Sequence, residues 1–254
     1  MVDPDAVAQA ITPHTILITV MHANNEVGTL QPIAAIGGIA HTHGIPFHTD
    51  AAQSVGKLAT LVDELHVDLL TVAGHKLYGP KGVGGLYLRR GLPVEPLIHG
   101  AGHERGRRAS TENVAGIVGL GEACRIVGEN LAETSGQLRT LRDQLQQSLI
   151  THGAEIFLNG HPTERLPNTL NVSFVGIDSS SLLAEVPEVA ASTGSACHAG
   201  QTEPSSVLLA MGTPREVALG AVRFSVGRWT TTEDVDQAVT SLVQRLNGLK
   251  GARI

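Results

Sequence analysis

Short apolar runs alternate with helical segments in the first part of the chain. Three runs predict buried strands, at residues 16–21, 45–49 and 69–73. Residues 32–42, between the first two runs, predict a helix, and a further strand and helix are expected at 84–89 and 113–129. Because β-α-β alternation is typical of sheets covered by helices, we predict an α/β fold with a parallel, doubly wound sheet.

The second half of the chain begins with a long amphipathic helix, expected from residue 129 to Gly153. Its apolar face carries Leu131, Leu138, Leu141, Leu145 and Leu149. Strands are expected at 170–174 and 221–226, and a closing helix at 233–246 has a capping box of Thr231 and Asp234 at its start. We therefore predict two domains, residues 1–140 and a smaller α+β domain at 141–254.

Composition narrows the class of protein. The chain has 254 residues, 42% of them hydrophobic, which is enough to bury a substantial core. A net charge of -6 argues against nucleic acid as a partner. Two cysteines in dissimilar contexts give no disulfide framework, and no apolar run approaches the ~18 residues of a membrane span. These features predict a cytoplasmic protein without a membrane anchor.

The candidate chemistry lies where two predicted strands end. Lys76 follows the run 69–73 in a glycine-rich loop with His75, and Asp50 follows the run 45–49. Singly, Lys76 would be a solvated loop lysine and Asp50 a helix cap. Together, an amine and a carboxylate at the carboxyl ends of strands suit Schiff-base chemistry, with the acid partnering a pyridine nitrogen.

Eight motifs follow one another along the chain. They are MHANNEVG (21–28), HTDAAQ (48–53), AGHKLYGPKG (73–82), HERG (103–106), STEN (110–113), LPNTLNVSF (166–174), GSAC (194–197) and RFSVGR (223–228). In this order they closely resemble cysteine desulfurases of the iron–sulfur cluster assembly type, in the class V aminotransferase family. The resemblance implies the type I fold of pyridoxal-phosphate-dependent transferases. Residues 1–140 would be the C-terminal portion of its large cofactor-binding domain.

The resemblance also implies a pyridoxal 5'-phosphate site. Lys76 would hold the cofactor as a Schiff base, and Asp50 would bond the pyridine nitrogen. Asn25 and Gln53 would contact the phenolic oxygen of the ring. Further positions would lie at the phosphate: Gly74 and His75, Ala73 where many relatives have a serine, and Thr111, which would reach the cofactor of a partner subunit. Because Ala73 lacks the serine hydroxyl, we expect weakened cofactor binding.

The substrate roles fall on three residues. Arg223, with Asn25, would bind the carboxylate of L-cysteine. Cys197 would take the sulfur as a persulfide, with release of L-alanine, and would pass it to an acceptor or iron–sulfur scaffold protein. There Cys197 would also be a transient iron–sulfur ligand. A homodimer is implied by Thr111. Cys124, in the apolar run 117–127, is expected to be a buried structural cysteine.

Several alternatives stay open. Members of the family carry a segment before the point where this sequence starts, so the N-terminal part of the fold is expected to be missing and activity of the chain alone is uncertain. Selenocysteine lyase is a close relative, and an inactive remnant or partner-binding module is the non-catalytic reading. A zinc hydrolase is disfavoured because the twelve histidines form no His-Glu-x-x-His motif. The glycines at 79–85 lack the Lys-Ser/Thr ending of a phosphate-binding loop.

Overall fold

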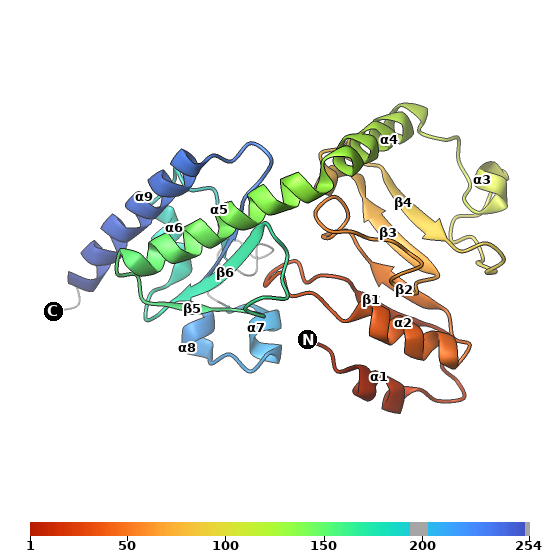
Figure 1. Ribbon diagram of the computed structural model, residues 1–254, viewed down its shortest axis with the longest axis horizontal. Helices are drawn as coiled ribbons and strands as arrows, with labels where there is room; N and C mark the ends of the chain where they lie inside the picture. Colours follow the sequence, from red (N-terminus) through yellow and green to blue (C-terminus); the bar gives the residue numbers. More distant parts are fainter. Residues whose placement is uncertain (194–202, 252–254) are drawn as a thin grey trace. The chain divides into compact units, whose positions relative to one another are not determined.

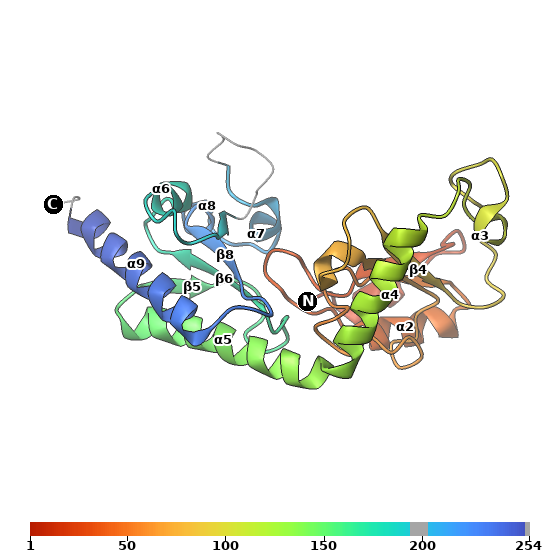
Figure 2. The ribbon, with the colours of Figure 1, turned by 90° about the horizontal axis from the view of Figure 1, so that it is seen from above.

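The computed structural model describes residues 1–193 and 203–251, and these form two compact units (Figures 1 and 2). The first unit contains Met1–Ala23 and Gln31–Leu131, and the second contains Asn24–Leu30 and Ala132–Ile254. A short segment near the N-terminus thus belongs to the C-terminal unit. Among the described residues, no helix combines the length and apolar character needed to cross a bilayer.

The first unit is built on a four-stranded sheet with the order β1-β2-β3-β4. Its strands are β1 (Ile18–Met21), β2 (Phe47–Asp50), β3 (Leu69–Ala73) and β4 (Gly84–Leu88). The first three are parallel, as predicted, and β4 runs antiparallel to β3, which makes the sheet mixed. The connection from β3 to β4 holds one short 3-10 turn and is too short for the crossover that a parallel neighbour requires.

Helices complete this unit. They are α1 (Pro4–Ala10), α2 (Ile33–Thr42), the 3-10 helix η1 (Gly74–Leu77), α3 (His103–Gly106) and α4 (Val114–Glu129). The core joins α2 to the sheet through Ile33, Ile36, Phe47 and Leu70. On α4, Cys124 is exposed, so the prediction of a buried cysteine is wrong. Apolar residues of the same helix, such as Val118, are also exposed, and the apolar run therefore does not mark a buried face here.

The second unit has an antiparallel sheet with the order β5-β6-β8-β7. Its strands are β5 (Ile156–Leu158), β6 (Thr169–Phe174), β7 (Ser192–Thr193) and β8 (Ala221–Ser225). Its helices are α5 (Leu131–Thr151), α6 (Ser179–Ala184), α7 (Ser206–Ala210), α8 (Arg215–Ala218) and α9 (Thr232–Gly251). Leucines of α5 share one core with β6, β8 and the apolar face of α9, which consists of Val235, Val239, Leu242 and Leu246. The predicted capping box of α9 is confirmed, because Asp234 Oδ2 accepts the backbone N–H of Thr231 at 2.8 Å and Thr231 Oγ1 accepts that of Asp234 at 3.1 Å.

The segment Asn24–Leu30 is fastened to the second unit by hydrogen bonds along its length. The backbone N–H of Leu166 donates to the carbonyl oxygen of Gly28 at 2.8 Å, and Asn171 Nδ2 donates to the carbonyl oxygen of Glu26 at 3.1 Å. Ser205 also donates to the carboxylate of Glu26. Gly28 has a φ of +73°, and a Cβ there would lie 3.1 Å from Thr169 Cβ. This close approach favours glycine and fixes the course of the segment.

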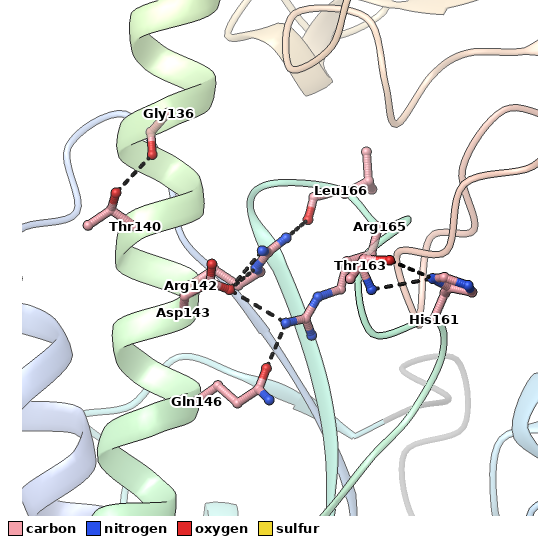
Figure 3. A network of polar contacts seen from close by, with 9 residues as sticks. All are labelled: Gly136, Thr140, Arg142, Asp143, Gln146, His161, Thr163, Arg165 and Leu166. Carbon is pink, nitrogen blue, oxygen red and sulfur yellow. Dashed lines mark hydrogen bonds and ion pairs between the residues drawn. The ribbon is translucent and has the colours of Figure 1, made fainter.

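A cluster of charged side chains connects α5 to the loop at residues 161–166, which precedes β6 (Figure 3). Two buried arginines reach the same carboxylate oxygen, Asp143 Oδ1, from Arg142 Nη2 at 2.7 Å and Arg165 Nη2 at 3.5 Å. Arg142 Nη1 also donates to the carbonyl oxygen of Leu166 at 2.8 Å. Burial and the charge of Arg142 lower the pKa of Arg165. The cluster therefore ties α5 to the loop before β6.

Candidate functional site

Lys76 and Asp50 lie at the carboxyl ends of adjacent parallel strands. Asp50 is the last residue of β2 and pairs in register with Thr71 of β3. Lys76 lies in η1, which directly follows β3. The Asp50 side chain is exposed, and its Oδ1 accepts the backbone N–H of Ala52 at 2.8 Å, which orients the carboxylate. An oriented carboxylate and a lysine thus occupy one edge of the sheet, where open α/β sheets bind ligands.

The turn that carries Lys76 is tightly packed. Gly74 is buried, and a Cβ added to it would lie 2.7 Å from the carbonyl oxygen of Val83. Tyr78 ends the turn in the left-handed conformation, and Gly79 donates its N–H to the carbonyl oxygen of Gly74 at 2.9 Å. His75 is exposed and Lys76 is partly buried. The backbone around the lysine is therefore fixed while the two side chains remain accessible.

Polar contacts that sequence reasoning missed lie close to Asp50 in the chain and in the sheet. His48 contacts Thr19 Oγ1 at 2.7 Å through Nδ1 and Thr71 Oγ1 at 2.9 Å through Nε2. Burial lowers the pKa of His48, and the charge of Asp50 opposes that shift. The buried His22 donates its backbone N–H to the carbonyl oxygen of Asp50 at 2.8 Å. His48 and Asp50 belong to the same motif, HTDAAQ, and this proximity in sequence could have indicated that His48 is part of the site.

The other predicted positions of the first unit differ in surroundings. Ala73 is the last residue of β3 and is partly buried. Gln53, also partly buried, follows β2, and its carbonyl oxygen accepts from Lys57 Nζ at 3.0 Å. Thr111 is exposed on the segment that leads into α4. An exposed threonine there is accessible to a ligand or a second subunit, and the predicted cross-subunit role stays a prediction.

The second unit brings Asn25 and Arg223 together. Arg223 on β8 donates through Nη1 to the carbonyl oxygen of Asn25 at 2.9 Å, and its Nη2 lies 3.4 Å from Ser192 Oγ. Among the described residues, no hydrogen-bond partner is present for its buried Nε. The Asn25 side chain is exposed. Cys197, the predicted sulfur-accepting residue and iron–sulfur ligand, lies outside the described residues.

The residues present fit pyridoxal 5'-phosphate. The first unit offers an exposed carboxylate at the end of β2 and a lysine amine and a histidine in η1, which are the groups needed for the cofactor's ring nitrogen, aldehyde and phosphate. Gly74 and Gly79 let the backbone turn sharply around the lysine. This donor set agrees with the chemistry expected of such a site.

Comparisons with known proteins agree with this arrangement. The family model described as aminotransferase class-V matches residues 1–238. The chain is 48% identical over 258 residues to a cysteine desulfurase IscS from Methanosarcina thermophila, covering 98% of this chain and 63% of that protein. It is 44% identical over 251 residues to a cysteine desulfurase IscS from Dictyoglomus turgidum, covering 98% of this chain and 64% of the relative. The chain thus spans less than two thirds of these relatives' length.

Solved structures show the same fold. A NifS-like protein, 36% identical, superposes with a TM-score of 0.88 over 97% of this chain and 65% of its own. A structure of SspA in complex with cysteine, 37% identical, gives a TM-score of 0.73 over 91% of this chain and 64% of its own. The predicted α/β fold, the type I fold of pyridoxal-phosphate-dependent transferases, is confirmed. With a family model that extends over most of its length, the chain belongs to the class V aminotransferase family, whose members depend on pyridoxal phosphate.

Proposed function

We propose that this chain carries the cofactor site of a cysteine desulfurase, which converts L-cysteine to L-alanine and transfers the sulfur to an enzyme cysteine. The observation that supports this most directly is the placement of Asp50 and Lys76 at the ends of β2 and β3. The 48% identity to a protein named cysteine desulfurase supports the choice of reaction within the family.

The proposed chemistry divides between two groups of the first unit. Bound pyridoxal phosphate supplies an electron sink for the negative charge that develops on the substrate's α-carbon. Asp50 would keep a proton on the ring nitrogen, which strengthens that sink. Lys76 would anchor the cofactor through its amine and, once displaced by the substrate's amine, would accept the proton from the α-carbon through Nζ. Gln53 and His75 would fix the ring oxygen and the phosphate.

Other residues would contact the substrate. Arg223 would pair with the carboxylate of L-cysteine, because its planar fork of donors matches a carboxylate, with Asn25 beside it. The thiolate of Cys197 would attack the substrate sulfur. A sulfur–sulfur bond then forms, the bond from sulfur to the β-carbon breaks with its electron pair left on carbon, and protonation of that carbon gives alanine. The 37% identity to SspA, solved in complex with cysteine, supports this substrate.

Partners follow from the same proposal. Thr111 would serve the cofactor of a second copy, so we propose a homodimer. The persulfide on Cys197 would be handed to an acceptor or iron–sulfur scaffold protein, where Cys197 would also be a transient cluster ligand. The thiol of Cys197 must be free, and not part of a disulfide, to attack the substrate sulfur, and a cytoplasmic location is proposed because that compartment keeps thiols reduced.

The proposal is tested by trapping the cofactor. The purified chain is incubated with pyridoxal phosphate, reduced with borohydride and mapped by mass spectrometry. We expect the label on Lys76 and a visible absorption band that Lys76→Ala abolishes. The control is Lys81→Ala, which removes an exposed lysine near the site and should change neither result. Absence of the band, or label scattered over surface lysines, would contradict the proposal. Alanine release from L-cysteine, with Cys197→Ser as control, then tests the reaction.

A further inference from the structure

The turn after β2 packs directly against the turn that carries Lys76. Gly56, in the first turn, has a φ of +81°, and a Cβ there would lie 3.2 Å from Leu77 Cβ and 3.3 Å from Val127 Cγ1. Both a left-handed backbone and a close approach therefore favour glycine at this position. The segment 51–58 is itself compact, with backbone N–H groups of Ser54 and Val55 donating to the carbonyl oxygen of Ala51 at 3.0 and 2.9 Å.

Lys57, the next residue, joins these two turns through its side chain. Its Nζ donates to the carbonyl oxygen of Gln53 at 3.0 Å and to that of Lys76 at 3.3 Å. The first bond lies within the turn after β2, and the second crosses to η1. Both acceptors are backbone atoms of residues that we assign to the cofactor. A single ammonium thus connects the segment that carries Gln53 to the segment that carries Lys76.

The Lys57 ammonium is largely removed from water, which costs free energy and distinguishes this residue from an ordinary surface lysine. Burial, followed by the charge of Lys76, lowers the pKa of Lys57 to about 8. A lysine can usually keep its charge in water by extending its flexible stem. Here the two carbonyl oxygens compensate for the lost water, so the charge is held between the turns instead.

We propose that Lys57 is a positioning residue, whose ammonium sets the Lys76 turn against the turn after β2 and so holds Lys76 ready for the cofactor. Its meaning for catalysis rests on the proposed function above. The two hydrogen bonds from Lys57 Nζ to the carbonyl oxygens of Gln53 and Lys76, here called the clamp, do not depend on that function, because they are present in the chain without cofactor.

Hydrogen exchange of the cofactor-free chain tests the clamp itself. The reporters are the amides of Tyr78 and Gly79, which both donate to the carbonyl oxygen of Gly74 in the clamped turn. Lys57→Met keeps the stem and removes the donor, and we expect about tenfold faster exchange at both amides. Lys57→Gln keeps an N–H donor without charge and should restore part of the protection. Lys81→Met, on the exposed part of the same loop, is the matched control.

Cofactor binding gives the second readout. We expect Lys57→Met to weaken pyridoxal phosphate binding about tenfold and to reduce the circular dichroism of the bound cofactor, which reports its fixed orientation. Partial recovery in Lys57→Gln would assign the effect to the donated hydrogen bonds. If the unaltered chain binds no cofactor, the proposed function fails, while the exchange measurement still decides the role of Lys57.

Two results would overturn the inference. In the first, exchange at Tyr78 and Gly79 in Lys57→Met stays within twofold of the Lys81→Met control. In the second, exchange rises equally in β1 and α2, which would make Lys57 a general contributor to stability and not a positioning residue for Lys76.

Discussion

At the scale of single residues, Ala73 tests how the cofactor's phosphate is held. The resemblance to cysteine desulfurases implies a serine at this position, immediately before the lysine turn. In the structure Ala73 ends β3 and is partly buried, so a hydroxyl there would lie at the start of η1. We predict that Ala73→Ser tightens pyridoxal phosphate binding by about tenfold or more, because a hydrogen bond to a charged group contributes roughly 1.5–3 kcal/mol. Titration of the visible band measures this, with Ala73→Gly as control; equal affinity of all three chains would contradict it.

His22 makes stability depend on pH. Its ring is buried and contacts Ser54 Oγ at 2.9 Å through Nδ1, and burial lowers its pKa below the ordinary 6.5. As the pH falls, the unfolded chain therefore takes up a proton on this ring before the folded chain does. The contribution of His22 to folding stability is fully present above pH 6.5 and is lost as the pH falls below that value. One proton contributes a slope of at most about 1.4 kcal/mol per pH unit.

Urea unfolding between pH 5.5 and 7.5 checks this prediction. We expect His22→Asn to reduce the slope of unfolding free energy against pH, whatever its effect on stability at neutral pH. His14→Asn, which alters an exposed histidine, should leave the slope unchanged. An unaltered slope in His22→Asn would show that other groups, such as His48, carry the dependence.

At the scale of elements, local pattern predicted what local interactions determine. The strand at 69–73 and the capping box of Thr231 and Asp234 are confirmed because each depends on neighbouring residues. The direction of β4 and the exposure of Cys124 depend on what packs against those elements, which periodicity does not reveal. Within the site, Lys76 and Asp50 could be placed near strand ends, whereas the hydrogen bonds of His22 and His48 join residues that are distant in sequence.

The charged cluster on α5 permits a stability prediction. Asp143 neutralises two arginines whose side chains are 6% and 5% exposed, while its own is 51% exposed. Asp143→Asn would leave Arg142 and Arg165 facing each other without that charge. We expect a loss of about 1–2 kcal/mol in urea unfolding, less than for a fully buried pair because water reaches Asp143. Glu133→Gln, an exposed change on the same helix, should cost little; an equal loss in both chains would refute the prediction.

At the scale of the whole molecule, the chain order does not follow the compact units. Asn24–Leu30 belongs with the C-terminal residues, although more than a hundred positions separate Glu26 from its hydrogen-bond partner Ser205. No local pattern in the sequence indicates this, because the segment falls between the strand predicted at 16–21 and the helix predicted at 32–42. The consequence is that Asn25, assigned to cofactor and substrate, is positioned by Arg223 and the sheet of the second unit.

Glu26 therefore should stabilise one unit selectively. Its carboxylate accepts from Ser205, whose side chain is almost wholly buried and also caps α7. Glu26→Ala would leave that hydroxyl without its acceptor. We expect the free energy of unfolding to fall by about 1–3 kcal/mol, because a buried donor without a partner costs its full desolvation penalty. In hydrogen exchange of the full chain, amides of β6 and β8 should exchange faster while those of β2 and β3 stay unchanged. Glu64→Ala, an exposed change in the first unit, is the control. Faster exchange in β2 and β3 as well would mean that the two units unfold together, and that the segment stabilises the chain as a whole.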